Sequence, residues 1–240
     1  MSFVTGNTGQ FPYFDTQLGR PEWKGKTLLD YGGNTGNILR HPDSTIDPAK
    51  YWCIDLSRDA IEIGRKASPG ANFIFYDRYN FEFNPTGIVD LPIPDTGDAR
   101  FDYIIASSVF THTSKTEMLQ TVDHLRNRLH PWGKMAFTFH DPHYVPTEGG
   151  ATNLNHYLKL RIINPYRRLA FVDKARHANW CTLAARDLYV DHEDVRRYAP
   201  DEQGAYLTFY TCDYIVRLFP QAELLNPVPP FVRHHCCVLG

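Results

Sequence analysis

The sequence predicts an α/β protein with a mostly parallel sheet covered by helices on both faces. Short apolar runs alternate with helix-spaced segments from residue 27 to residue 140. A glycine-rich turn follows the first of these runs, in the stretch LLDYGGNTGN of residues 28–37. This alternation of strands and helices implies parallel strands joined by right-handed crossovers. In such sheets, ligands bind beyond the carboxyl ends of the strands.

The first three strands are predicted at residues 27–31, 51–56 and 72–76, where buried apolar runs end at turn signals. After the glycine turn, residues 37–40 are expected to begin a short helix that Pro42 stops. Ser57 is expected to cap a second helix. That helix carries apolar residues at helical spacing, namely Ala60, Ile63 and Ala67.

A fourth strand is predicted at residues 101–106, followed by a helix that opens with the capping-box pair Ser114 and Glu117. Its apolar face consists of Met118, Val122, Leu125 and Leu129. Residues 130–133 are expected to close this helix. A fifth strand then covers residues 134–139, and the alternation stops there.

The chain is expected to form one domain of 240 residues with four parts. Residues 1–26 precede the first strand, 27–140 form the alternating core, 141–207 are an insertion after the fifth strand, and 208–240 complete the sheet. In the last part, Ile215, Leu218 and Phe219 mark a helix, the prolines of 226–230 mark a loop, and 231–239 form a closing strand.

Composition excludes several classes of protein. A net charge of -2 and a pI near 6.6 argue against sequence-independent nucleic-acid binding, which needs a surplus of Lys and Arg. No apolar window reaches the roughly 18 residues of a membrane span, and residues 1–10 do not resemble a secretory signal. We therefore expect a cytoplasmic protein with a small-molecule partner. The five cysteines show no C-x-x-C spacing, which favours reduced thiols over a zinc site.

The glycine turn fits neither common nucleotide loop. A P-loop needs Lys and then Ser or Thr after its last glycine, but Gly36 is followed by Asn37 and Ile38. The dinucleotide pattern G-x-G-x-x-G also fails, because Asn34 and Asn37 occupy its later glycine positions. The turn resembles instead the D-x-G-x-G-x-G loop of class I S-adenosylmethionine (SAM) methyltransferases, with Asn34 replacing one glycine. Asn tolerates a left-handed backbone, so the loop can keep its shape.

Later segments extend this resemblance through about residues 27–140. The stretches LPIPDTGDARFD, IIASSVFTHTS and LRNRLHPWGKMAFTF are similar to successive blocks of small-molecule methyltransferases of this family, in the family order. The resemblance implies a Rossmann-like, seven-stranded sheet whose last strand is antiparallel. It also implies a set of cofactor-binding residues: Asp30, Gly32, Gly33, Asn34, Gly36, Asp55, Leu56, Asp77, Arg78, Ser107 and Ser108.

Two acidic residues are central to this set. Asp55 ends the second strand, 23 residues after Gly32 (55 minus 32), where an acid can accept hydrogen bonds from ribose hydroxyls. Because Ser57 already supplies a helix cap, we prefer the ribose role for Asp55. Asp30 can pair with the cofactor's ammonium group, or it can hold the turn by hydrogen bonds of its own.

Methyl transfer from a sulfonium is an in-line displacement, in which the protein aligns the reactants and excludes water. A hydroxyl acceptor also needs a base, usually His at neutral pH. The candidates are His140 and His143 after the fifth strand and His112 after the fourth. We favour His140 as the base, and expect His112 to shape the pocket and cap the next helix. For an amine acceptor, positioning without any base is the competing mechanism.

No metal site is expected. His140, Asp141 and His143 are plausible ligand types but fall short of a coordination set. In HHCC, residues 234–237, alternation along a strand sends neighbouring side chains to opposite faces, which favours strand packing. The aromatic residues of 11–23 form either a flap over the cofactor or a strap anchored on the core.

We therefore expect a methyltransferase of a biosynthetic pathway that moves a methyl group from SAM to a hydroxyl or amine of a small metabolite and releases S-adenosyl-L-homocysteine (SAH). Two alternatives remain open. One is a nucleic-acid methyltransferase, which would need a basic stripe on its surface. The other is a non-catalytic protein that binds SAM or a partner. The sequence does not indicate an oligomeric state.

Overall fold

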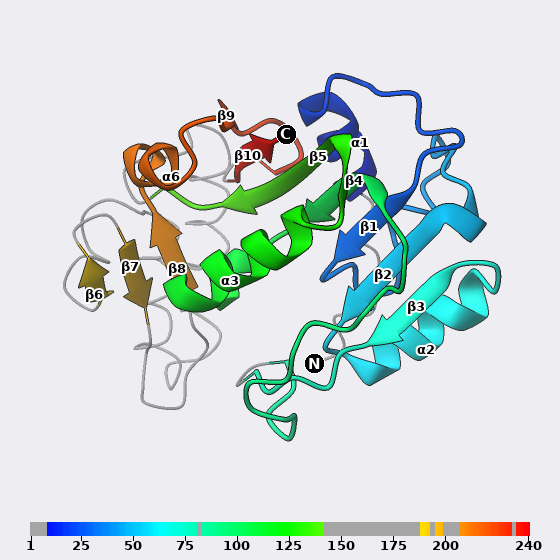
Figure 1. The fold of residues 1–240 in the computed structure, drawn as a ribbon, viewed down its shortest axis with the longest axis horizontal. Coiled ribbons are helices and arrows are strands. Elements are labelled where there is room, and N and C mark those ends of the chain that lie inside the picture. Colours follow the sequence, from blue (N-terminus) through cyan, green and yellow to red (C-terminus); the bar gives the residue numbers. More distant parts are fainter. Residues whose placement is uncertain (1–8, 81–82, 142–187, 193–194, 199–206, 232–233) are drawn as a thin grey trace, which may run out of the picture.

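The computed structural model describes residues 9–80, 83–141, 188–192, 195–198, 207–231 and 234–240. Its main sheet has seven strands in the order β3-β2-β1-β4-β5-β10-β9 (Figure 1). They are β1 (Leu28–Tyr31), β2 (Tyr51–Asp55), β3 (Asn72–Phe75), β4 (Phe101–Ala106), β5 (Leu129–Phe139), β9 (Glu223–Leu225) and β10 (His235–Leu239). The strands β1 to β5 are parallel, and β10 is antiparallel to β5 and β9. The predicted Rossmann-like sheet with an antiparallel last strand is confirmed.

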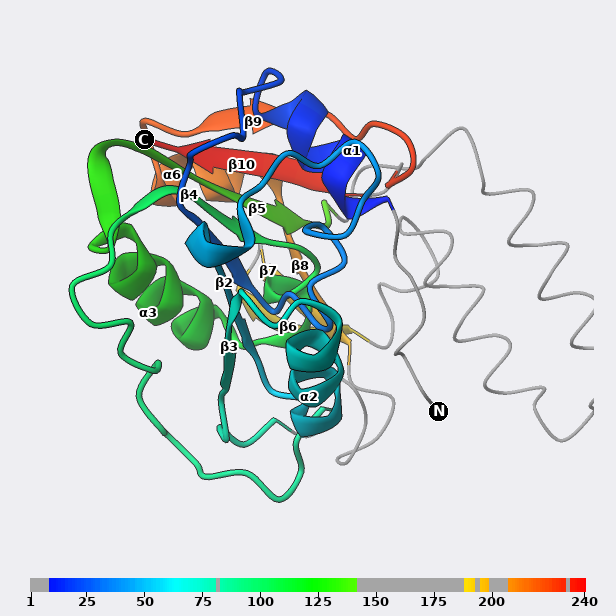
Figure 2. The same ribbon diagram turned by 90° about the vertical axis from the view of Figure 1, so that its right-hand side faces the viewer.

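Helices cover both faces of this sheet. The helices α3 (Lys115–Arg126) and α6 (Cys212–Leu218) lie on one face, and α1 (Gln10–Gln17) and α2 (Arg58–Ala67) lie on the other (Figure 2). Each face has its own buried apolar cluster. Strand β1 is buried along its whole length, as expected for a strand enclosed between two helical layers.

The predicted helix starts are confirmed at α2 and α3. The hydroxyl of Ser57 accepts a hydrogen bond from the backbone N–H of Ala60 at 3.2 Å, and Ser114 accepts one from Glu117 at 3.1 Å. Each bond satisfies a backbone donor that has no partner within the helix. The predicted apolar face of α3 is buried at Met118, Val122 and Leu125; Leu129 begins β5 instead.

The helix expected at residues 37–40 is wrong. Consecutive turns occur there, with the N–H of Leu39 bonded to Gly36 O and that of Arg40 to Asn37 O, each three residues back. Gly36 has a left-handed backbone (φ +74°) and Pro42 follows soon after. Too few residues remain between them to offset the cost of nucleating a helix.

The buried face of α2 also differs from the prediction. The helix buries Ala60, Ile61 and Gly64, whereas Ile63 is 37% exposed. The ring of Phe73 on β3 lies directly against Gly64, where a β-carbon would come within 2.3 Å of the ring. Packing against β3, rather than the apolar spacing alone, therefore sets the rotation of this helix.

Strand β5 begins earlier than predicted, because residues 130–133 are strand and do not close the preceding helix. The register between β4 and β5 shifts between Phe101 and Tyr103, which accommodates the extra residues as a bulge. A β-carbon on Gly133 would lie 2.6 Å from Phe101 O. The absence of a side chain at Gly133 thus permits the close approach of the two strands.

A second, antiparallel sheet consists of β6 (Leu188–His192), β7 (Val195–Tyr198) and β8 (Leu207–Tyr210). The strands β6 and β7 lie in the predicted insertion, whereas β8 lies mostly in the part predicted to complete the main sheet. The N–H of Tyr210 donates to His140 O at 2.9 Å, which joins β8 to the end of β5. Among the described residues, there are also two short 3-10 helices, η1 (Pro48–Lys50) and η2 (Phe110–His112). The division of the chain into four parts stays a prediction.

Candidate functional site

A tight loop follows β1 at the carboxyl edge of the parallel strands. Gly32 (φ +75°), Asn34 (φ +53°) and Gly36 (φ +74°) are all left-handed. The expectation that Asn34 adopts a left-handed backbone in place of a glycine is therefore confirmed. A β-carbon on Gly33 would lie 2.5 Å from Asp30 Cγ, so the loop backbone rests directly on the carboxyl group below it.

Asp30 is buried beneath this loop. Its Oδ2 accepts a hydrogen bond from the Tyr51 hydroxyl at 2.7 Å, and its Oδ1 has no hydrogen-bond partner among the described residues. Burial raises the pKa of Asp30 to about 7; the bond from Tyr51 opposes this shift, and the nearby Asp55 adds to it. The hydrogen bond of Asp30 thus runs to the neighbouring strand β2, and both roles considered for Asp30 stay predictions; its second oxygen is available to a cationic group.

Asp55 joins the loop to the start of α2. Its Oδ2 accepts from the N–H of Asn34 at 2.7 Å, and its Oδ1 accepts from the N–H of Ser57 at 2.8 Å. Burial raises the pKa of Asp55, against the lowering effect of these backbone donors. Two carboxylate oxygens offer about four acceptor positions, so this carboxylate can still accept hydrogen bonds from a ligand. We call Asp30, residues 32–36 and Asp55 the loop site.

Asp77 and Arg78, from the predicted cofactor-binding set, make hydrogen bonds and an ion pair within the protein. Asp77 Oδ1 accepts from the side-chain amide of Asn84 at 3.0 Å. The Arg78 guanidinium lies 3.2 Å from the Glu117 carboxylate of α3 and donates to Leu91 O at 3.0 Å. These bonds position the loop after β3. Leu56 packs against the apolar cluster on the α3 side of the sheet. Contact of these residues with a ligand stays a prediction.

Two neighbouring strands end in a second group of polar side chains. Ser108 follows β4 with a left-handed backbone (φ +56°), and its N–H donates to Thr138 Oγ1 at 2.7 Å. His140 follows β5 and is buried. Its ring lies 4.4 Å from the ring of His234, centroid to centroid, and Ser108 Oγ is 2.8 Å from His234 Nε2. We call Ser108, His140 and His234 the histidine site.

Sequence reasoning missed His234, because it assigned residues 231–239 to a strand. Strand β10 begins only at His235, which pairs with Phe139 on β5. His234 therefore precedes the strand at the same edge as His140, which follows its own strand. The predicted alternation holds farther along β10, where Cys236 and Cys237 join the clusters on opposite faces.

The remaining candidate histidines lie elsewhere. The ring of His112 packs edge-on against Phe83 at 5.2 Å, and its backbone carbonyl accepts from Asn80. His112 does not cap α3, because Ser114 is the N-cap residue. His143 lies outside the described residues. Ser107 is buried beside Ser108, at the end of β4.

A metal site and a membrane span find no support in the described residues. Those residues contain no group of three or more His, Cys, Asp or Glu side chains arranged to hold a metal ion. Within the same ranges, no helix has both the length and the apolar character needed to cross a membrane. Asp141 accepts a hydrogen bond from the N–H of Cys212 at 3.0 Å, at the start of α6.

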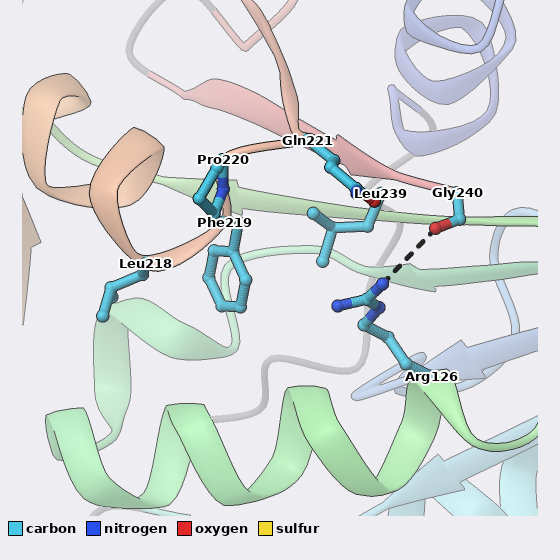
Figure 3. Close-up of a pocket in the computed structure, with 7 residues that line it drawn as sticks. All are labelled: Arg126, Leu218, Phe219, Pro220, Gln221, Leu239 and Gly240. Atoms are coloured by element: carbon cyan, nitrogen blue, oxygen red, sulfur yellow. Dashed lines mark hydrogen bonds between the residues drawn. The ribbon is translucent and has the colours of Figure 1, made fainter.

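Two surface cavities of the described residues lie away from both sites. Figure 3 shows one of about 170 Å³ near the carboxyl end of β10, where Arg126 donates to Gly240 O at 3.4 Å. Leu239 beside it pairs with Met135, four residues before the end of β5, so this cavity faces away from the carboxyl edge. We place the candidate functional site at that edge because ligands of parallel sheets bind there.

Known proteins that are similar to this chain include methyltransferases. Residues 29–135 match a family model described as a methyltransferase domain. A search of curated proteins finds no match. Similar solved structures include the glycopeptide N-methyltransferase MtfA (13% identity, TM-score 0.54, covering 99% of this chain and 91% of that chain). Others are the PH0226 protein from Pyrococcus horikoshii OT3 (15%, 0.53, 95% and 88%) and a DhpI-SAM-HEP complex (14%, 0.50, 96% and 89%).

Proposed function

We propose that this chain, whose residues 29–135 match a methyltransferase domain, is a class I, SAM-dependent methyltransferase that methylates a hydroxyl or amine of a small metabolite in a biosynthetic pathway. Its cofactor is SAM, and SAH is the product of transfer. The observation that carries the proposal is the bond between Asp55 and the left-handed Asn34, which holds an acidic side chain beside the loop site. The similar structures, all of low identity, support the fold.

The loop site fits SAM by its chemistry. The buried Oδ1 of Asp30, which has no partner among the described residues, can accept a hydrogen bond from the ammonium group of the cofactor. Asp55 can accept hydrogen bonds from the ribose hydroxyls of the cofactor. A helix dipole does not contribute here, because turns follow the loop. When bound, SAM supplies a methyl group activated by the sulfonium charge.

The protein's own residues then have three tasks. The loop site binds and orients the cofactor, and the strand ends at Ser107 and Ser108 line the path toward the acceptor. His140 takes the proton of a hydroxyl acceptor as the new bond forms. With an amine acceptor, alignment alone suffices, and His140 then contributes to the shape of the pocket.

A labelling experiment tests this proposal. The chain is incubated with methyl-labelled SAM and an extract of its source cells, separated beforehand into small molecules, nucleic acids and proteins. We expect label in the small-molecule fraction. Label confined to the nucleic-acid or protein fraction would reject a small metabolite as acceptor. SAM binding without transfer to any fraction would favour the non-catalytic alternative.

A further inference from the structure

Two imidazole rings meet at the histidine site from opposite directions along the chain. His140 ends a parallel strand, and His234 precedes an antiparallel one whose first residue, His235, pairs with Phe139. The two rings are 4.4 Å apart, centroid to centroid, at an interplanar angle of 49°. The ring of Phe209 on β8 lies 6.1 Å from that of His140, on a third element. The two rings are therefore positioned by the strands β5, β8 and β10 and not by a single loop.

His234 is held from two further parts of the chain. Ser108 Oγ lies 2.8 Å from His234 Nε2, and the Tyr13 hydroxyl of α1 donates to His234 O at 2.9 Å. Ser108 itself has a left-handed backbone, fixed by the bond of its N–H to Thr138. A non-glycine residue keeps such a conformation only where its surroundings enforce it, and such residues cluster at functional sites.

In the described ranges, the titratable groups near the pair come from four parts of the chain: the end of β5, β10, α1 and the start of α6. Asp141, after β5, accepts a hydrogen bond at the start of α6. Burial lowers the pKa of His235 on β10, which favours its neutral form, although Asp141 opposes that shift. Burial raises the pKa of Tyr13 on α1, so this phenol also stays neutral. Cys212, at the start of α6, has its pKa raised to about 12 by burial.

We propose that His140 and His234 act as one proton-accepting pair for a hydroxyl acceptor, with Ser108 positioning His234. This inference rests on the proposed function and narrows it to O-methylation. Two imidazolium cations in ring contact would repel each other, so the first proton on the pair disfavours a second. An amine acceptor would not need such a device, because its lone pair can attack before any proton is lost.

The step balances in charge and in atoms. A lone pair of the acceptor oxygen forms the new C–O bond, while the C–S bond breaks and its electron pair stays on sulfur. The O–H proton passes to a neutral imidazole nitrogen of the pair. The positive charge lost at sulfur therefore reappears on the histidine pair, and no additional reactant is required.

The charge difference between SAM and SAH provides a test that needs no known acceptor. The two ligands share their amino, carboxyl and adenosine groups, but only SAM carries the sulfonium charge. If the pair lies beside the methyl group, a protonated pair repels SAM more than SAH. We therefore expect the ratio Kd(SAM)/Kd(SAH), measured calorimetrically, to fall several-fold as the pH rises from about 5.5 to about 8.5.

Variants assign this pH dependence to the pair. The double variant His140→Gln/His234→Gln should give a nearly constant ratio, and Ser108→Ala should move the pH at which the ratio changes. His124→Gln on α3 serves as the matched control and should retain the behaviour of the wild type. In imidazole NMR titrations, replacing His234 by Gln should move the titration midpoint of His140 to higher pH by roughly one unit, because a competing cation is removed.

The outcomes separate the two proposals. Binding of both ligands with a ratio that is constant over pH in the wild type would overturn the pair while leaving the methyltransferase proposal intact. The pair would also be overturned if the titration midpoint of each histidine, His140 or His234, stays the same when the other histidine is replaced. If neither ligand binds the wild type, the proposed function itself fails. A pH-dependent ratio that is lost in the double variant, with coupled midpoints, would support the pair.

Discussion

The loop site and the histidine site lie at the carboxyl edge of the same sheet but draw on the sequence in different ways. The loop site comes from one stretch, residues 30–55, in which the Asp55 carboxylate accepts hydrogen bonds from the N–H groups of Asn34 and Ser57. The histidine site combines residues 108, 140 and 234 and is braced by residue 13. A local site can be recognised as a motif, whereas a site assembled from distant strand ends requires the register of the sheet.

The largest effect should come from breaking the histidine site alone. We expect His140→Ala to lower methyl transfer by roughly 10² to 10⁴, the range typical of losing a general base. Its affinity for SAM should stay close to that of the wild type, because the loop site is untouched. Transfer to the small-molecule fraction and calorimetry measure the two quantities, with His124→Ala as the control. Full transfer by a folded His140→Ala variant would remove His140 as the base.

Breaking the loop site should have the opposite pattern. In Gly33→Ala, the new methyl group would lie 2.5 Å from Asp30 Cγ and 2.9 Å from Cys53 Sγ, so the loop must shift. We expect SAM binding to weaken by about 1–3 kcal/mol, the usual cost of overpacking.

Gly70→Ala is the matched control for this substitution, since its β-carbon would meet only Pro48 at an ordinary 3.7 Å. Calorimetry on both variants measures the difference. Equal SAM affinities for Gly33→Ala and Gly70→Ala would show that the contact between the loop and Asp30 does not shape the binding site.

The buried Asp30 of the loop site should make the free energy of unfolding depend on pH. Its pKa is about 7 in the folded protein, against an ordinary value of 3.8. The folded chain thus binds this proton more tightly than the unfolded chain, so the stability that Asp30 contributes at low pH is lost as the pH rises from about 4 through 7. The Asp30→Asn variant keeps an oxygen that accepts from the Tyr51 hydroxyl, and it removes the decrease in stability at high pH because the amide does not ionise.

We therefore expect Asp30→Asn to be more stable than the wild type by roughly 1–3 kcal/mol at pH 8, and by much less at pH 5. Urea unfolding at the two pH values measures both differences. Asp59→Asn, on the exposed surface of α2, should show no such pattern. A constant stability difference between pH 5 and pH 8 would mean that Asp30 is already ionised throughout this range.

The smallest effect should come from removing the hydrogen bond that the Tyr13 hydroxyl donates to His234 O at the histidine site. Tyr13→Phe keeps the ring that packs against Phe14 and Phe231, and removes only the hydroxyl that donates to His234 O. We expect a loss of about 0.5–1.5 kcal/mol in the free energy of unfolding, with unchanged SAM affinity. Thermal unfolding and calorimetry test this. A large loss of SAM binding would instead link α1 to the cofactor, as in the flap alternative.

The sequence predicted the sheet and the backbone shape of the glycine turn well because both depend on local signals. Apolar runs give the strands, and the tolerance of Asn34 for a left-handed backbone preserves the glycine loop. The helix at residues 37–40 failed because periodicity does not report the cost of nucleation between Gly36 and Pro42. His234 could not be recognised without the pairing of His235 with Phe139, which is set by tertiary structure.

The N-terminal aromatic residues illustrate the same limit. Phe11, Tyr13, Phe14 and Trp23 are all buried in the apolar cluster on the α1 side of the sheet, together with residues of β1 and β10. These contacts agree with the anchored strap, one of the two alternatives that the sequence left open. Aromatic content alone could not decide between them, because a strap and a flap need the same residue types.

The central claim is that the loop site binds SAM, and calorimetric titration of the purified chain, freed of any bound ligand, tests it most directly. We predict that SAM and SAH bind and NAD does not, and that Asp55→Ala weakens SAM binding by about 1–3 kcal/mol through loss of a charged hydrogen-bond acceptor. Asp59→Ala is the control. Failure of both adenosyl ligands to bind, or equal SAM affinity in a folded Asp55→Ala variant, would contradict the assignment of the loop site.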